Sequence, residues 1–151
     1  FSHTSGISIE EAKNFIAKYF NAFPSIKKWQ EEIISYAKSF GYVKNENGRR
    51  RLLPQATSNH PRFRAEAERM AMNMPVQSLN ADIIKSAMVT THRMARLLLS
   101  IHDELIFEIP DDMLEKTARN IKEAMETVYT LSVPLRVETK IGKNWGEMKP
   151  Y

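Results

Sequence analysis

Two neighbouring carboxylates, Asp103 and Glu104, stand between two apolar runs of the sequence. The run at 97–101 and the alternating run at 105–109 both have the composition of β-strands, so the carboxylates are predicted at the tip of a tight hairpin. Magnesium sites for phosphoryl transfer combine one or two aspartates with phosphate oxygens of the substrate. Asp103 and Glu104 could therefore contribute to such a site without completing it. Aspartate is also a common turn former, and the hairpin alone leaves both interpretations open.

A second polar group consists of Arg69, Asn73 and Gln77, which are spaced four residues apart within a helical pattern. On an α-helix such residues form one polar ridge about 12 Å long. All three side chains offer donors to the acceptors that every base pair presents in the minor groove, so the ridge could sense the shape of a pair without reading its sequence. The alternative is an ordinary solvated helix face.

The segments that must position these residues begin with two helices. Ser8 and Glu11 form a capping-box pattern ahead of an apolar stripe. A second stripe begins after Pro24 and stops at Gly41, a natural helix terminator. Because only a short break separates them, the two helices are predicted to form an αα-hairpin.

A small β-ribbon at 42–53 and a long helix at 61–95 are predicted next. The dipeptide Asn47-Gly48 favours a hairpin turn, and a cluster of three arginines follows it directly. Pro75 is expected to kink the long helix because proline removes a backbone donor. The ribbon is therefore predicted to present a basic cluster, and the helix to carry the polar ridge.

After the hairpin of Asp103, another helix is predicted from about Pro110, and 135–141 alternates like a final strand. Four residues of that helix are predicted to face inward: Leu114, Ile121, Met125 and Val128. The predicted class is α+β: a helical segment with a small β-ribbon, then a long kinked helix and an antiparallel sheet backed by helices.

Composition excludes several classes of protein. The chain has 151 residues, no cysteine and four scattered histidines, so disulfides, thiolate metal sites and structural zinc are not expected. No apolar stretch is long enough to span a membrane, and no signal peptide is evident, so a cytoplasmic location is expected. The net charge is +4, with basic residues concentrated in 44–69 and acidic residues in 101–126. This distribution suits a protein that holds a polyanion near metal ions, although solvated helix faces produce it too.

The hairpin segment resembles the family A DNA polymerase motif Val-His-Asp-Glu-Leu-Val-Phe-Glu. The matching residues are Ile101, His102, Asp103, Glu104, Leu105, Ile106, Phe107 and Glu108. The resemblance implies that Asp103 binds the catalytic magnesium ions, that His102 lies near the primer terminus and that Glu104 assists at the metal site.

The ridge segment, 67–77, is similar to the family's Ala-Glu-Arg-x-x-x-Asn-x-Pro-x-Gln. Shorter matches are Gly-Arg-Arg-x-x-x-Pro at 48–54, Ala-Asp-Ile-Ile-Lys at 81–85 and Gly-x-Asn-Trp at 142–145. The resemblance implies DNA contacts by six residues: Arg69, Asn73, Gln77, Arg64, Arg50 and Arg51. One departure is Ser78, which stands where the family usually has glycine, so the local fit of template or primer could differ.

The family's first catalytic aspartate motif and its nucleotide-binding helix are not found in this sequence. The resemblance therefore predicts a fragment, a proteolytic product or one chain of a split enzyme, with 1–59 as the later part of the fingers subdomain and 60–151 as the later part of the palm. The missing N-terminal part would be its partner. The chain alone is expected to be inactive.

The expected function of the completed assembly is template-directed DNA synthesis by a two-metal-ion mechanism. It would use two Mg²⁺ ions, primer-template DNA and deoxynucleoside triphosphates, in the cytoplasm of a bacterial or phage-infected cell. Two rivals remain. A noncatalytic DNA-binding module would explain the arginines and the ridge, and a structural helical interaction domain would explain the apolar stripes.

Overall fold

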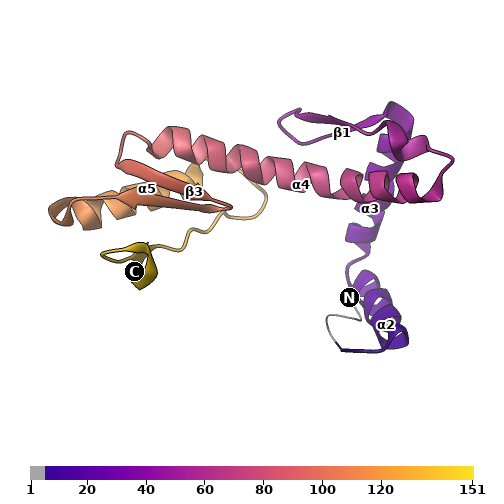
Figure 1. Ribbon diagram of the computed structural model, residues 1–151, viewed down its shortest axis with the longest axis horizontal. Helices are drawn as coiled ribbons and strands as arrows, with labels where there is room; N and C mark the ends of the chain where they lie inside the picture. The colour runs from indigo at the N-terminus through magenta and orange to yellow at the C-terminus, as the bar shows by residue number, and fades with distance from the viewer. Residues whose placement is uncertain (1–5) are drawn as a thin grey trace. The chain divides into compact units, whose positions relative to one another are not determined.

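The structure, a computed structural model, describes residues 6–151 (Figure 1). It combines helices with small antiparallel sheets, which confirms the predicted α+β class. The chain divides into two compact units, Phe1–Ser78 and Leu79–Tyr151. The division falls inside the long helix α4, Pro61–Thr91, which therefore contributes to both units. The predicted subdomain boundary between residues 59 and 60 stays a prediction.

Helix α2, Ile9–Ala22, begins at the predicted capping box. The Glu11 backbone N–H donates to Ser8 Oγ at 3.2 Å, and the Ser8 backbone N–H donates to Glu11 Oε2 at 2.9 Å. The bond from the Ser8 backbone N–H to the Glu11 carboxylate, and after it the Ser8 side chain, stabilise the charged form and so hold the pKa of Glu11 below its ordinary value. The cap thus fixes the helix start that the sequence predicts.

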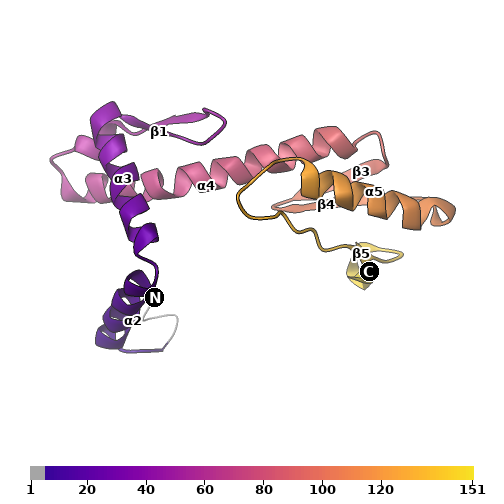
Figure 2. The same ribbon diagram turned by 180° about the vertical axis from the view of Figure 1, so that it is seen from behind.

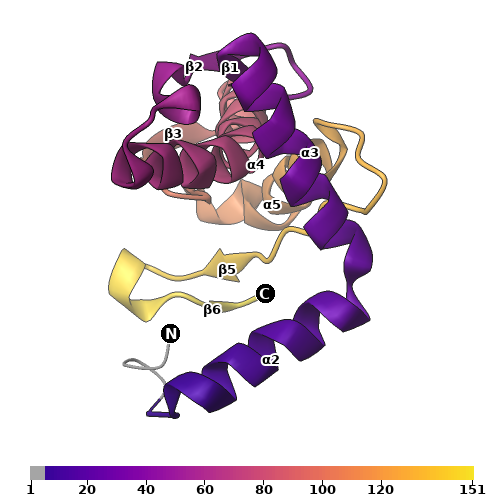
Figure 3. The same cartoon turned by 90° about the vertical axis from the view of Figure 1, so that its right-hand side faces the viewer.

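Helix α3, Pro24–Phe40, follows α2 with only Phe23 between them. It ends at Gly41, which has a φ of 72° and whose N–H donates to the Ala37 carbonyl at 2.9 Å. The predicted αα-hairpin is wrong in one respect, because α2 turns away from α3 at their junction instead of lying alongside it (Figure 3). A one-residue link is too short for the chain to reverse between two packed helices.

The β-ribbon consists of β1, Tyr42–Lys44, and β2, Arg50–Leu52, paired antiparallel. Its turn is closed by the Gly48 N–H donating to the Asn45 carbonyl at 3.0 Å, and Gly48 has a φ of 80° that favours glycine. The 3-10 helix η1, Pro54–Thr57, leads from the ribbon towards α4. The turn and the strands lie where the sequence predicts them.

The core of the first unit lies between α3, the ribbon, η1 and the first half of α4. Its buried members are Ala37, Val43, Leu53, Ala56, Ala67, Ala71 and Met74. Alanines on α3, η1 and α4 let the backbones approach closely, while Val43 and Leu53 fill the space from the ribbon side. Only one face of the ribbon packs against this core, so the packing determines which side chains of β2 point towards α4. Helix α4 continues through Pro75, and the kink expected there stays a prediction.

The second unit contains the predicted hairpin of β3, Arg96–Ile101, and β4, Glu104–Glu108. The 3-10 helix η2, Asp111–Met113, leads into α5, Leu114–Thr127, which lies beside this hairpin (Figure 2). The four residues predicted to face inward from this helix are all buried or half-buried, as is the stretch formed by Thr117 and Ala118. No helix among residues 6–151 is both long and apolar enough to cross a membrane.

The strand predicted at 135–141 forms only at its end. Residues Lys140–Ile141 make β5, which pairs with β6, Lys149–Pro150, across the 3-10 helix η3, Trp145–Glu147. Odd-numbered residues of 135–141 are half-buried and even-numbered ones exposed, which explains the alternation in the sequence. The Val137 N–H donates at 3.0 Å to Glu126 Oε1 of the preceding helical segment, so a side chain takes the place of a partner strand.

Candidate nucleic-acid interface and metal-ligand hairpin

The hairpin tip consists of only two residues, His102 and Asp103, because Ile101 pairs directly with Glu104. His102 has a φ of 53°, and it is the only residue other than glycine with positive φ in the part of the chain that is described. Positive φ at the first central position is typical of the type II′ turns that suit two-residue hairpins. The geometry is costly for a non-glycine residue, and such strain is often found at functional sites.

The strands below the tip hold it in place. Leu97 pairs with Phe107 and Leu99 with Ile106, so Leu98 is an extra residue that forms a bulge in β3. At the far end, Arg96 Nη1 lies 3.0 Å from Glu108 Oε2. Asp103 and Glu104 are both exposed at the opposite end. The two carboxylates are therefore presented to solvent from a paired scaffold, as the sequence predicts.

The donor chemistry of the tip fits part of a magnesium site. Asp103 and Glu104 supply carboxylate oxygens, which hard divalent cations prefer. Among residues 6–151, no group of three or more histidine, aspartate or glutamate side chains is gathered around a possible metal position. Magnesium for phosphoryl transfer is commonly held by one or two carboxylates plus substrate phosphates, so two donors agree with a partial ligand set.

The polar ridge lies on α4 as predicted, with Arg69, Asn73 and Gln77 all exposed. It borders an open groove of about 550 Å³ within the first unit. The groove is lined by Arg51, Glu66, Arg69, Met70, Asn73, Met74, Gln77 and Ser78. Glu66, Met70 and Met74 were not predicted as site residues. Their spacing of three or four residues from the ridge positions is the sequence signal that could have found them.

The ribbon adds Arg51 to the ridge and directs Arg50 elsewhere. Arg51 pairs with Val43, which is fully buried, so both lie on the face of the ribbon that packs on α4. The Arg51 guanidinium Nη2 is 3.5 Å from Met70 Sδ on α4. Arg50 lies on the other face, with its guanidinium carbon 4.9 Å from the centre of the Tyr42 ring. Arg50 and Arg51, although consecutive in the sequence, therefore lie on opposite faces of the ribbon.

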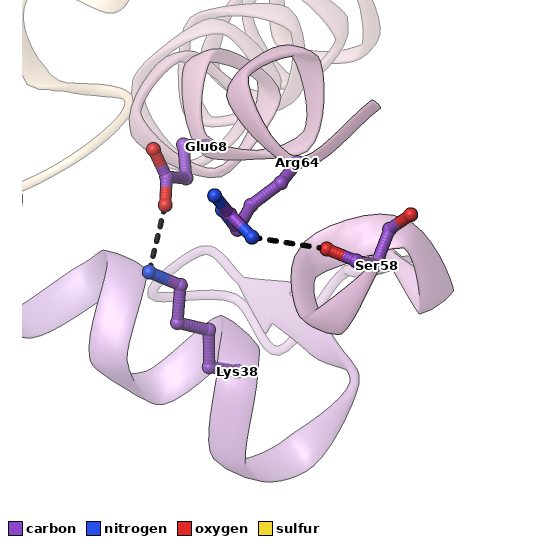
Figure 4. A network of polar contacts seen from close by, with 4 residues as sticks. All are labelled: Lys38, Ser58, Arg64 and Glu68. Carbon is purple, nitrogen blue, oxygen red and sulfur yellow. Dashed lines mark hydrogen bonds and ion pairs between the residues drawn. The ribbon is translucent and has the colours of Figure 1, made fainter. Parts of the chain in front are cut away.

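Arg64 is half-buried near the start of α4 and makes an internal contact. Its Nη1 donates to the Ser58 carbonyl at 3.2 Å, which ties α4 to the end of η1 (Figure 4). Close by, Lys38 Nζ of α3 lies 2.7 Å from Glu68 Oε1 of α4. Arg64 therefore has a clear structural role, and its contact with DNA stays a prediction.

Ser78, the departure from the family pattern, lies at the groove beside Gln77. Its hydroxyl is 3.5 Å from the Pro75 carbonyl and 3.8 Å from Met74 Sδ, which are long contacts. The position is helical, so the backbone does not need glycine there. Serine at this position adds a hydroxyl group to the lining of the groove.

Comparison with known proteins decides the family. The family model described as DNA polymerase family A matches residues 1–147. This chain belongs to DNA polymerase family A. It is 43% identical over 153 residues to the thermostable DNA polymerase I of Thermus filiformis and 45% identical over 150 residues to the DNA polymerase I of Bacillus caldotenax. These alignments cover 98% and 95% of this chain but only 18% and 17% of the relatives.

A solved structure agrees with this membership of DNA polymerase family A. The chain is similar to the POL domain of Pol1 from M. smegmatis, which is described as a complex with DNA primer-template and dNTP. The TM-score is 0.84 and the sequence identity 35%. The match covers 89% of this family A chain and 25% of the neighbour, so this chain corresponds to a minor part of that domain.

Proposed function

We propose that this chain is the later fingers (1–59) and later palm (60–151) part of a DNA-directed DNA polymerase, which is completed by an N-terminal part that carries the remaining catalytic residues. The observation that carries the proposal is Asp103 at the exposed tip of the β3–β4 hairpin in a family A chain. The M. smegmatis relative, described with primer-template and dNTP, supports the same substrates for this chain. The place of action would be the cytoplasm of a bacterial or phage-infected cell.

In the proposed reaction, the primer 3′ oxygen forms a bond to the α-phosphorus of the incoming nucleotide, and the bond to the leaving pyrophosphate breaks. Two Mg²⁺ ions, when bound, would favour the 3′ alkoxide and neutralise charge on the pyrophosphate. Asp103 would hold metal through its carboxylate, with Glu104 assisting and His102 lying near the primer terminus. The N-terminal part would supply the remaining ligands.

The groove would hold the minor-groove side of the primer-template. Arg69, Asn73 and Gln77 would donate to acceptors that are common to all base pairs, so a mispair that displaces an acceptor loses a hydrogen bond. Arg51, on the same groove, would neutralise phosphates, and Arg50 and Arg64 would add contacts to the backbone. This division explains why the ridge is polar and why Arg51 lies beside it.

A noncatalytic DNA-binding chain is the alternative, and two experiments separate the hypotheses. The chain should bind primer-template DNA with an affinity that falls as salt rises, and loss of one phosphate contact should reduce the log–log slope by about 0.9. Addition of the N-terminal part should then give nucleotide incorporation. Binding without incorporation would favour the noncatalytic alternative, and salt-independent or absent binding would contradict both.

A further inference from the structure

The face of the ribbon that points away from the core carries an aromatic group that the proposed reaction does not use. Tyr36 and Phe40 are one helical turn apart on α3, with ring centres 4.5 Å apart. The Tyr42 ring of β1 lies 5.7 Å from Tyr36 and 6.3 Å from Phe40. Three rings from a helix and a strand therefore form one cluster. We use the name aromatic face for these three rings together with Arg50 and Lys44.

The rings of the aromatic face contact one another although they lie outside the core. The Tyr36 hydroxyl donates to the Tyr42 hydroxyl at 3.1 Å, which joins the two rings. This bond raises the pKa of the donor Tyr36 and lowers that of the acceptor Tyr42, since only the donor must break it to ionise. Phe40 nevertheless keeps 60% of its surface exposed. An aromatic ring that packs against neighbouring rings and still has an exposed surface is suited to contact another flat group.

The charges around these rings are positive. Arg50 stacks over Tyr42 at 4.9 Å, and Lys44 pairs with Arg50 across the ribbon, so both belong to this face. Lys44 and Arg50 are both exposed. Exposed π-faces combined with cations are the recurring elements of surfaces that bind single-stranded nucleic acid, where bases stack and phosphates meet positive charge. Charge complementarity thus favours a nucleic-acid strand over an apolar protein segment.

We propose that the aromatic face binds unpaired bases of a DNA single strand, with Phe40 as the main stacking surface. The proposal rests on the proposed function, since a primer-template carries unpaired template bases beyond its duplex. Stacking is tolerant of sequence because every base offers a π-face. The groove lined by Arg51 and the aromatic face lie on opposite sides of the ribbon. The duplex part of one primer-template would therefore contact the groove, and its unpaired bases would contact the aromatic face.

The test compares three fluorescent DNAs by anisotropy with the chain: a blunt duplex, the same duplex with a single-stranded thymidine extension, and the same extension made abasic. The normal extension should increase affinity about 5-fold or more over the abasic one, because only the bases differ. Phe40→Ala should remove this gain, whereas Phe40→Trp should retain it. Phe63→Ala is the matched control, since Phe63 is 51% exposed in the same unit but outside the aromatic face.

Each outcome decides between the two proposals. A base-dependent gain that Phe40→Ala abolishes and Phe63→Ala preserves supports the aromatic face, even if blunt duplex is not bound and the duplex function fails. Duplex binding without a base-dependent gain, or a gain that survives Phe40→Ala, overturns the aromatic face and leaves the proposed function intact. Self-association of the chain that Phe40→Ala abolishes, with no gain from bases, would assign the face to a second copy instead. Absence of all DNA binding overturns both proposals.

Discussion

Replacement of Leu53 by alanine should strongly destabilise the first unit, whereas the same change at Leu52 should not. Leu53 is 2% exposed within the core, and Leu52 is 76% exposed. Removing a buried leucine side chain costs about 2–5 kcal/mol, because the lost transfer energy adds to the cost of the cavity. A unit of this size is stable by about 4–12 kcal/mol, so Leu53→Ala should remove a large share of its stability. Leu52→Ala should cost less than about 0.5 kcal/mol.

The assay is urea denaturation of both variants followed by circular dichroism. The unfolding free energies of variant and parent are compared on condition that both depend on urea concentration with the same slope. The result also tests the site, because the side chains of a strand alternate between faces and a one-residue shift exchanges them. If Leu52→Ala costs as much as Leu53→Ala, the register is wrong. Arg50 and not Arg51 would then face the groove, and the reasoning for both proposals would fail.

Three further predictions concern the ridge, the hairpin tip and the first helix. In a polymerase that contains this chain, Arg69→Ala and Gln77→Ala should each extend mispaired primers abnormally, and unchanged primer binding and extension would refute the groove-sensing role. His102→Val should destabilise the second unit by about 1–2 kcal/mol relative to His102→Gly in urea denaturation, because β-branched residues resist positive φ; equal stability would contradict the turn geometry. The capping box should stabilise α2 at pH values above the ordinary pKa of glutamate, and this stability should be lost as pH falls through the lowered pKa of Glu11. Ser8→Ala should therefore abolish the acid-dependent loss of helicity that circular dichroism measures. An unchanged pH profile would argue against the cap.

Much of the fold follows from local signals in the sequence. The capping box at Ser8, the helix end at Gly41 and the ribbon turn at Gly48 are each fixed by residues within a few positions, and all three are confirmed. The hairpin of Asp103 likewise joins two strands that are neighbours in the sequence. Such features need no knowledge of distant packing, which is why the sequence predicts them.

Features that depend on tertiary partners were missed or mispredicted. The alternation at 135–141 correctly indicates a segment with one buried side, but burial alone does not show whether a strand pairs with it. The arginine cluster predicts a basic ribbon, yet only the burial of Val43 reveals that Arg51 faces α4 and Arg50 does not. The junction at Phe23 likewise permits two helices without specifying their angle.

The most direct test of the central claim is the rate of nucleotide incorporation by a polymerase containing this chain with Asp103→Asn. The substitution keeps the size and turn preference of the residue but removes its charge. Incorporation should fall about 100-fold or more while DNA affinity stays broadly intact, because the metals lose a ligand and positioning survives. Asp112→Asn, at another exposed aspartate of the same unit, should leave the rate unchanged. Near-normal incorporation by the Asp103→Asn enzyme at saturating nucleotide and magnesium would contradict the catalytic assignment and make Asp103 an ordinary turn residue.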